Sequence, residues 1–194
     1  MLKKIPLFVL FGSILLLAAC GGKPEGDFSI DVKDFTYTNQ DGEQVSKSDL
    51  EGKIWIADFI YTTCLTECPQ MTYNKQRIEK ALKEEGIEDV EFVSFSIDPE
   101  VDTPEVLKEY GEVRGIDFTN GNWTFLTGYD YDTIREFAVS SFKTVAEDMN
   151  DGTYAHGVSL TIVTPEGKAI KQYNGMYLNE DKIKEVVEFI KSML

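Results

Sequence analysis

The chain has 194 residues, 42% hydrophobic and 27% charged, a composition typical of a globular protein long enough to bury a core. This excludes a chain that is disordered throughout, and no internal repeat recurs at a fixed spacing. Acidic residues number 34 against 19 lysines and arginines, a formal net charge of −15. Such a balance argues against a nucleic-acid partner, because phosphate binding needs clustered basic residues. We interpret the acidity as an aid to solubility.

Residues 1–19 have the features of a bacterial lipoprotein signal peptide. Two lysines near the start precede an apolar segment at 5–19, which is shorter than the roughly 20 residues of a transmembrane helix. The segment ends in Leu-Ala-Ala-Cys-Gly, which resembles a lipobox, and in lipoproteins the cysteine becomes the acylated first residue. We therefore expect acyl chains on Cys20 to anchor the protein at the outer, extracytoplasmic face of the cell membrane, each buried CH₂ contributing about 0.8 kcal/mol. A plain secretory signal is the alternative.

The remaining chain is predicted to be a lipidated tether at 20–27 and one domain at 28–194. Outside the cytoplasm thiols tend to be oxidised, and with Cys20 lipidated only Cys64 and Cys68 remain. A disulfide that closes so short a loop removes little entropy from the unfolded chain, so it would be a weak staple. The pair therefore suggests chemistry.

The first half of the domain alternates strands and helices. A strand is expected at 35–38, a helical turn at 46–52 and a buried central strand at 54–60. A helix follows the cysteines, and then come a strand at 90–97 and a helix from Pro104 to Val113. Asp58 in the apolar central strand is costly to bury unless it is paired.

The second half continues the pattern, with a strand at 123–126 and a helix from Tyr131 to Ala138. Further strands are expected at 142–145, 158–163 and 169–173, the first two flanking an acidic loop at 147–152. Asn179 should cap a final amphipathic helix. The order predicts an α/β domain with a mixed central sheet and helices on both faces.

The two cysteines directly follow the predicted central strand, in the sequence Cys-Leu-Thr-Glu-Cys-Pro that ends at Pro69. Ligands of open α/β sheets gather at the carboxyl ends of strands, and a helix start favours thiolate over thiol. If the chain is helical from Cys64 onward, Cys64 and Cys68 share one face. Their sulfurs could then hold one soft metal ion or close into a disulfide.

Two thiolates with an imidazole suit Cu(I), Cu(II) or Zn(II), and His156 is the only histidine. A structural zinc site normally has four protein ligands, so three soft or borderline ligands favour copper modestly. The alternatives are an ordinary surface histidine at 156 and cysteines that are small buried hydrophobes.

Four other residues are assigned supporting or structural roles around the cysteines. Asp98 ends the neighbouring strand and is a candidate to support the ligands or face a partner. Asp102 is expected to cap the helix that begins at Pro104. Met71 is expected to pack in the core rather than bind metal, and Pro69 fits a first helical turn.

Four sequence features in order resemble the Sco family, named for synthesis of cytochrome c oxidase: FIYTTCLTECPQM, SFSIDPEVDTPEVL, WTFLTG and the histidine before the strand at 158–163. The resemblance runs from about Phe35 to the C-terminus. It implies a thioredoxin-like fold and copper bound by the two cysteines and His156. It also implies a role in building the binuclear copper (CuA) centre of the oxidase, with the oxidase subunit that carries this centre as partner. Family members often have serine after the histidine, whereas this chain has Gly157, which predicts a looser loop.

The cysteine pair is compatible with three functions, which the sequence favours to different degrees. A copper metallochaperone, without a small-molecule substrate, is favoured over a thiol–disulfide oxidoreductase that uses the two cysteines to reduce the partner's copper-ligand cysteines. The cysteine spacing is one residue longer than in thioredoxins, and Val158 stands where their cis-proline would be. A peroxidase of the peroxiredoxin type is weakest, because Ala57 and Tyr61 replace the proline and threonine of its motif.

Overall fold

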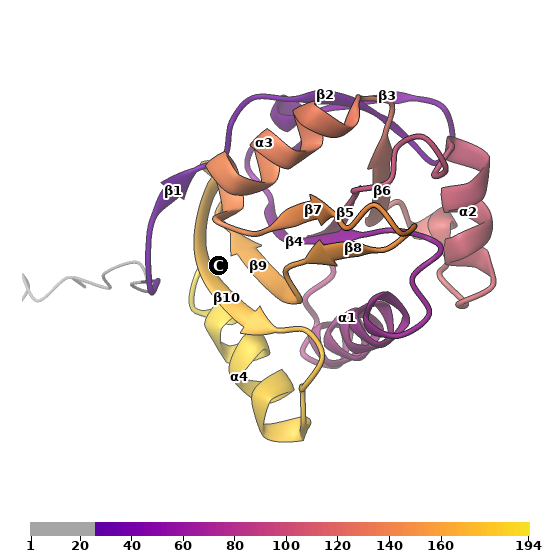
Figure 1. Cartoon of the computed structure of the whole chain (residues 1–194). Coiled ribbons are helices and arrows are strands. Elements are labelled where there is room, and N and C mark those ends of the chain that lie inside the picture. Colours follow the sequence, from indigo (N-terminus) through magenta and orange to yellow (C-terminus); the bar gives the residue numbers. More distant parts are fainter. Residues whose placement is uncertain (1–25) are drawn as a thin grey trace, which may run out of the picture.

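The computed structural model describes residues 26–194, so the predicted signal peptide and Cys20 lie outside the described residues. Eight strands form one sheet in the order β1-β10-β9-β4-β5-β6-β2-β3 (Figure 1). Their bounds are β1 Ile30–Asp31, β2 Thr36–Asn39, β3 Gln44–Ser46, β4 Ile54–Ile60, β5 Val90–Ser96, β6 Trp123–Thr127, β9 Ser159–Val163 and β10 Lys168–Asn174. A separate hairpin consists of β7 Ala146–Asp148 and β8 Tyr154–His156.

The centre of the sheet is parallel. β5 pairs with β4 on one side and β6 on the other in parallel register, whereas β9 runs antiparallel to β4. Every residue of β4 is buried. A strand covered on both faces needs apolar side chains without alternation, which is the pattern that predicted this strand.

Helices cover both faces of the sheet. They are α1 Glu67–Glu84, α2 Pro104–Glu112, α3 Tyr131–Phe142 and α4 Glu180–Lys191. α1 and α4 lie on the opposite side of the sheet from α3 (Figure 1). The rings of Phe137 and Phe142 on α3 pack 5.0 and 5.9 Å from the ring of Phe95 in β5. The predicted mixed sheet with helices on both faces is confirmed, as is the Asn179 cap, whose side chain accepts from Lys182 N–H.

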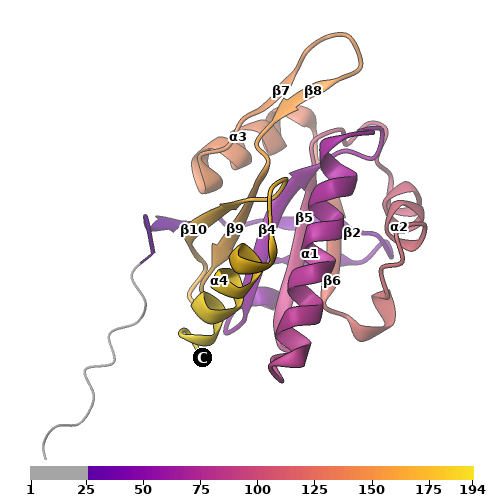
Figure 2. The same cartoon turned by 90° about the horizontal axis from the view of Figure 1, so that it is seen from below.

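The segment before the hairpin corrects one expectation. The strand predicted at 142–145 is wrong, because Phe142 belongs to the last turn of α3. Lys143 adopts a left-handed conformation with φ 52° and ends the helix, and the β7 strand begins only at Ala146. The β7–β8 hairpin then extends away from the sheet, and β8, which ends at His156, runs back toward it (Figure 2).

The predicted acidic loop is therefore the outer part of this hairpin, with Glu147 paired opposite Ala155. The predicted helical turn is a short 3₁₀ helix at Lys47–Leu50. Within residues 26–194, none of the helices combines the length and the apolar character that crossing a bilayer requires.

Candidate metal centre

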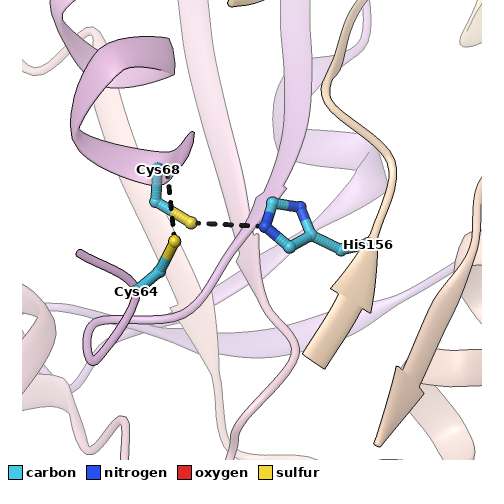
Figure 3. Close-up of side chains that lie close together, drawn as sticks. All are labelled: Cys64, Cys68 and His156. Carbon is cyan, nitrogen blue, oxygen red and sulfur yellow. Dashed lines mark hydrogen bonds between the residues drawn. The ribbon is translucent and has the colours of Figure 1, made fainter. Parts of the chain in front are cut away.

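The cysteines lie where β4 passes into α1. Cys64 sits in a turn, its N–H donating to the Tyr61 carbonyl at 3.2 Å, and α1 begins only at Glu67. A helix that continues from Cys64, the condition under which the sequence placed both sulfurs on one helical face, is thus not formed. The two side chains meet instead because the Cys68 N–H, free in the first helical turn, donates to the Cys64 sulfur at 3.4 Å (Figure 3). Pro69 occupies the first turn, as predicted.

His156 reaches the cysteines from the end of β8. Its Nε2 lies 3.6 Å from the Cys68 sulfur, and its Nδ1 lies 3.1 Å from the Gly157 carbonyl oxygen (Figure 3). A carbonyl oxygen only accepts, so Nδ1 is the donor in that contact. When the ring is neutral, this bond leaves the Nε2 lone pair directed at the sulfurs, the tautomer that a metal ligand needs.

The structure brings together all three residues that the sequence singled out. One ligand atom from each of Cys64, Cys68 and His156 lies within 4.8 Å of the others. Neither cysteine forms a disulfide, both are buried, and the histidine is half-buried. Two sulfurs and one imidazole nitrogen at this spacing form a donor set for a soft or borderline metal ion.

Hydrogen bonding between the two cysteines shifts their pKa values in opposite directions. The side-chain hydrogen bond with Cys68 lowers the pKa of Cys64, although burial opposes it. The same hydrogen bond, with burial, raises the pKa of Cys68. Burial lowers the pKa of His156, but hydrogen bonding to the Cys64 sulfur and the Gly157 carbonyl outweighs it and leaves this pKa raised. Cys64 therefore loses its proton more readily than Cys68.

Asp102 does not cap the helix at Pro104, which corrects the prediction. Thr103 is the cap, its hydroxyl accepting from the Val106 N–H at 3.4 Å. The buried Asp102 carboxylate instead accepts from the Thr62 backbone N–H at 3.1 Å, the Thr62 hydroxyl and the Ser96 hydroxyl at 2.6 Å. It thereby fixes the backbone two residues before Cys64.

Asp98 contacts β8, the strand that carries His156. Its carboxylate accepts from the Tyr154 hydroxyl at 3.1 Å, two residues before His156 in β8. Asp98 thus ties the hairpin to the end of β5 and supports the histidine through its strand. Met71 is fully buried in the core, as predicted.

Gly157 is packed tightly. A Cβ placed there would lie 1.8 Å from the Thr144 hydroxyl oxygen, and the Gly157 N–H donates to the Val145 carbonyl at 3.1 Å. The loosening expected from glycine is therefore offset by these contacts, since the small residue lets Thr144 approach the histidine loop.

Sequence reasoning missed the partner of Asp58. Lys75 of α1 donates from Nζ to the Asp58 carboxylate at 2.7 Å and to the Ser94 hydroxyl at 2.6 Å. Two signals pointed to it: a carboxylate in an apolar strand needs a partner, and Lys75 lies two helical turns beyond Cys68, on the buried face of α1.

Fold and site together define a thioredoxin-like domain that carries a dithiol–histidine cluster at the carboxyl end of its central strand. The model of the SCO1/SenC family matches residues 25–192, and the chain belongs to that family. It is 44% identical over 164 residues to the "SCO1 protein homolog" of Bacillus subtilis (strain 168), covering 84% of this chain and 83% of the relative.

Three solved structures are similar. One is a SCO1/SenC family lipoprotein from Bacillus anthracis str. Ames, with TM-score 0.79 and 37% identity, covering 84% of this chain and 95% of that one. Another is BsSco, described as a member of the Sco family of cytochrome c oxidase assembly proteins with a disulfide switch; the TM-score is 0.77, with 40% identity and coverage of 87% and 96%. Arabidopsis thaliana ScoI with copper bound has TM-score 0.70 and 26% identity, with coverage of 82% and 97%.

Proposed function

We propose that the protein is a copper metallochaperone for assembly of the CuA centre of cytochrome c oxidase, with copper held by Cys64, Cys68 and His156. The observation that carries the proposal is the convergence of two sulfurs and one imidazole nitrogen within 4.8 Å at a strand end. The copper-bound Arabidopsis ScoI and the oxidase-assembly description of BsSco support it.

The residues have distinct parts in binding. Cys64, whose pKa the hydrogen bond with Cys68 lowers, supplies one thiolate ligand, and Cys68 loses its proton on binding. His156 adds its Nε2, oriented by the hydrogen bond from Nδ1 to Gly157. Three protein ligands leave copper able to accept a donor from the oxidase subunit, which transfer requires.

The protein would act at the outer face of the cell membrane. Acylated Cys20 would anchor the mature chain after removal of residues 1–19, and the tether at 20–27 would connect it to the domain at 28–194. The related B. anthracis protein is described as a lipoprotein, which supports this arrangement.

The same site supports a second function, that of a thiol–disulfide oxidoreductase. A Cys64 thiolate beside a Cys68 thiol is the arrangement such chemistry needs. Cys64 would attack a disulfide between the oxidase subunit's copper-ligand cysteines, forming a mixed disulfide and releasing one partner sulfur as a thiolate. Cys68 would then lose its proton and attack the Cys64 sulfur, releasing the other partner sulfur. Two electrons would pass to the partner, leaving a Cys64–Cys68 disulfide. The disulfide switch described for BsSco favours keeping this alternative.

The variant His156→Ala separates the two functions. It removes the imidazole but leaves both sulfurs on their local segment, so Cu(II) binding should fall by at least about tenfold, while reduction of the disulfide by a small dithiol changes little. The metallochaperone proposal predicts that oxidase assembly fails in cells with this variant. Normal oxidase assembly with His156→Ala, together with loss of assembly with Cys64→Ser, would reject copper delivery as the function and favour thiol reduction.

A further inference from the structure

A fully buried ion pair joins β4 to α1, the strand and the helix that flank the cysteine turn. Asp58 in β4 and Lys75 in α1 are both 0% exposed and 2.7 Å apart, with Ser94 of β5 as a second partner of the ammonium group. The Lys75 nitrogen also lies 5.0 Å from the centre of the Trp123 ring. Within residues 26–194, one carboxylate oxygen of Asp58 is buried with no hydrogen-bond partner.

Stability does not account for this pair. Removing two charges from water costs several kcal/mol per ion, and well-packed apolar residues of similar volume are often as stable or more stable. Burial does lower the pKa of Lys75 even with Asp58 beside it. The unpaired carboxylate oxygen adds to the cost, because a buried acceptor without a donor keeps its desolvation penalty.

The position of the pair connects it to the sulfurs. Lys75 follows Cys68 by seven residues, two turns along the buried face of α1, with Met71 between them. Asp58 belongs to the strand that leads into the Cys64 turn. Interactions between charges are weakly screened in such an interior. Accordingly Asp58 contributes to raising the pKa of Cys68, and Cys68 contributes in the same direction to that of Lys75.

We infer that Lys75 and Asp58 form a buried charge pair that sets the electrostatic potential at the two cysteine sulfurs. Lys75 stabilises the thiolate and copper-bound forms, and Asp58 opposes it. Two thiolates, a neutral imidazole and Cu(I) carry one net negative charge, so the energy of the loaded site depends on both buried charges. For copper this inference rests on the proposed function; for the dithiol it stands alone, because the disulfide is neutral whereas the two sulfurs formed by its reduction can carry negative charge beside the pair.

The test compares Lys75→Met, Asp58→Asn and the double variant. Lys75→Met leaves an uncompensated carboxylate and should weaken Cu(I) binding at least about tenfold, whereas Asp58→Asn should strengthen it at least about threefold. The double variant should fall between the two single variants. Lys53→Met, which removes a lysine paired with Glu91 before the start of β4, is the matched control and should leave Cu(I) binding unchanged. Affinity is measured in competition with a chromophoric Cu(I) chelator.

A second readout uses metal-free protein equilibrated with reduced and oxidised glutathione. Forming the Cys64–Cys68 disulfide releases two electrons, and oxidised glutathione takes them up to become two reduced molecules. Lys75→Met should shift this equilibrium at least about tenfold toward the disulfide, which is about 30 mV in potential, and Asp58→Asn should shift it the other way. If Lys75→Met does not fold, the other two variants still test the inference, because Asp58→Asn should bind Cu(I) more tightly than the double variant.

If the pair had a structural role alone, Cu(I) affinity and the glutathione equilibrium would shift in the same direction in both single variants, and that result overturns the inference. Shifts below twofold in both single variants would also overturn it. Opposed glutathione shifts in a protein whose wild type binds no copper would uphold the inference while rejecting the proposed function. Copper binding by the wild type without opposed shifts would reject the inference alone.

Discussion

Gly157→Ala should disturb the site through a single contact. The added Cβ would meet the Thr144 hydroxyl oxygen at 1.8 Å, and contacts of Cβ atoms below 3.0 Å are essentially never seen, so the two atoms must separate by more than 1 Å. Overpacking of this kind costs about 1–3 kcal/mol, and we expect a loss of about 2 kcal/mol in the free energy of unfolding. Metal affinity should fall as well, because the Gly157 carbonyl orients His156.

Thr144→Ala provides the rescue. Without the hydroxyl, the nearest remaining atom is the residue 144 Cβ at 3.2 Å, a tight contact that a small shift relieves. Urea unfolding of the wild type, both single variants and the double variant gives a double-mutant cycle, with an expected coupling of about 1–2 kcal/mol. A Gly157→Ala protein as stable as the wild type, or a double variant no better than Gly157→Ala, would refute the packing argument.

The remaining predictions concern the cysteine turn, the anchor and the thiolate. Asp102→Ala removes the acceptor for Thr62 and should lower the free energy of unfolding by about 2 kcal/mol, measured by urea unfolding; an unchanged midpoint contradicts the assigned role. Cys20→Ala should release the protein from the membrane or leave it unprocessed, and an acylated, membrane-bound product would reject the lipobox. Ultraviolet titration of the reduced, metal-free domain should show one thiolate below neutral pH, since the pKa of Cys64 is lowered and that of Cys68 raised; two thiols titrating near the ordinary value of about 8.5 would contradict this.

The sequence was informative where one strong pattern decided the structure. The apolar run of β4 could only be a buried strand, and the cysteines after it had to lie at the end of the sheet. The cluster of Cys64, Cys68 and His156 joins segments 88 residues apart. Ligand chemistry and the single histidine suggested the set, and the family resemblance strengthened it.

Two expectations were wrong because the local sequence was compatible with more than one structure. Phe142 suits either a strand or a helix, and its burial against the sheet as part of α3 decides the matter. Asp102 was expected to cap the helix, but Thr103 beside it can cap equally well, and Asp102 instead accepts from the Thr62 N–H. The short β7–β8 pairing depends on contacts with Tyr131 and Asp98, which no local pattern reveals.

The most direct measurement of the central claim is the copper content of the domain at 28–194, purified without oxygen, in its reduced form and as the Cys64–Cys68 disulfide. A metal centre built on both sulfurs predicts one copper per reduced chain and far less in the disulfide form, which offers no thiolate. Equal copper uptake by the two forms would contradict the site proposed here.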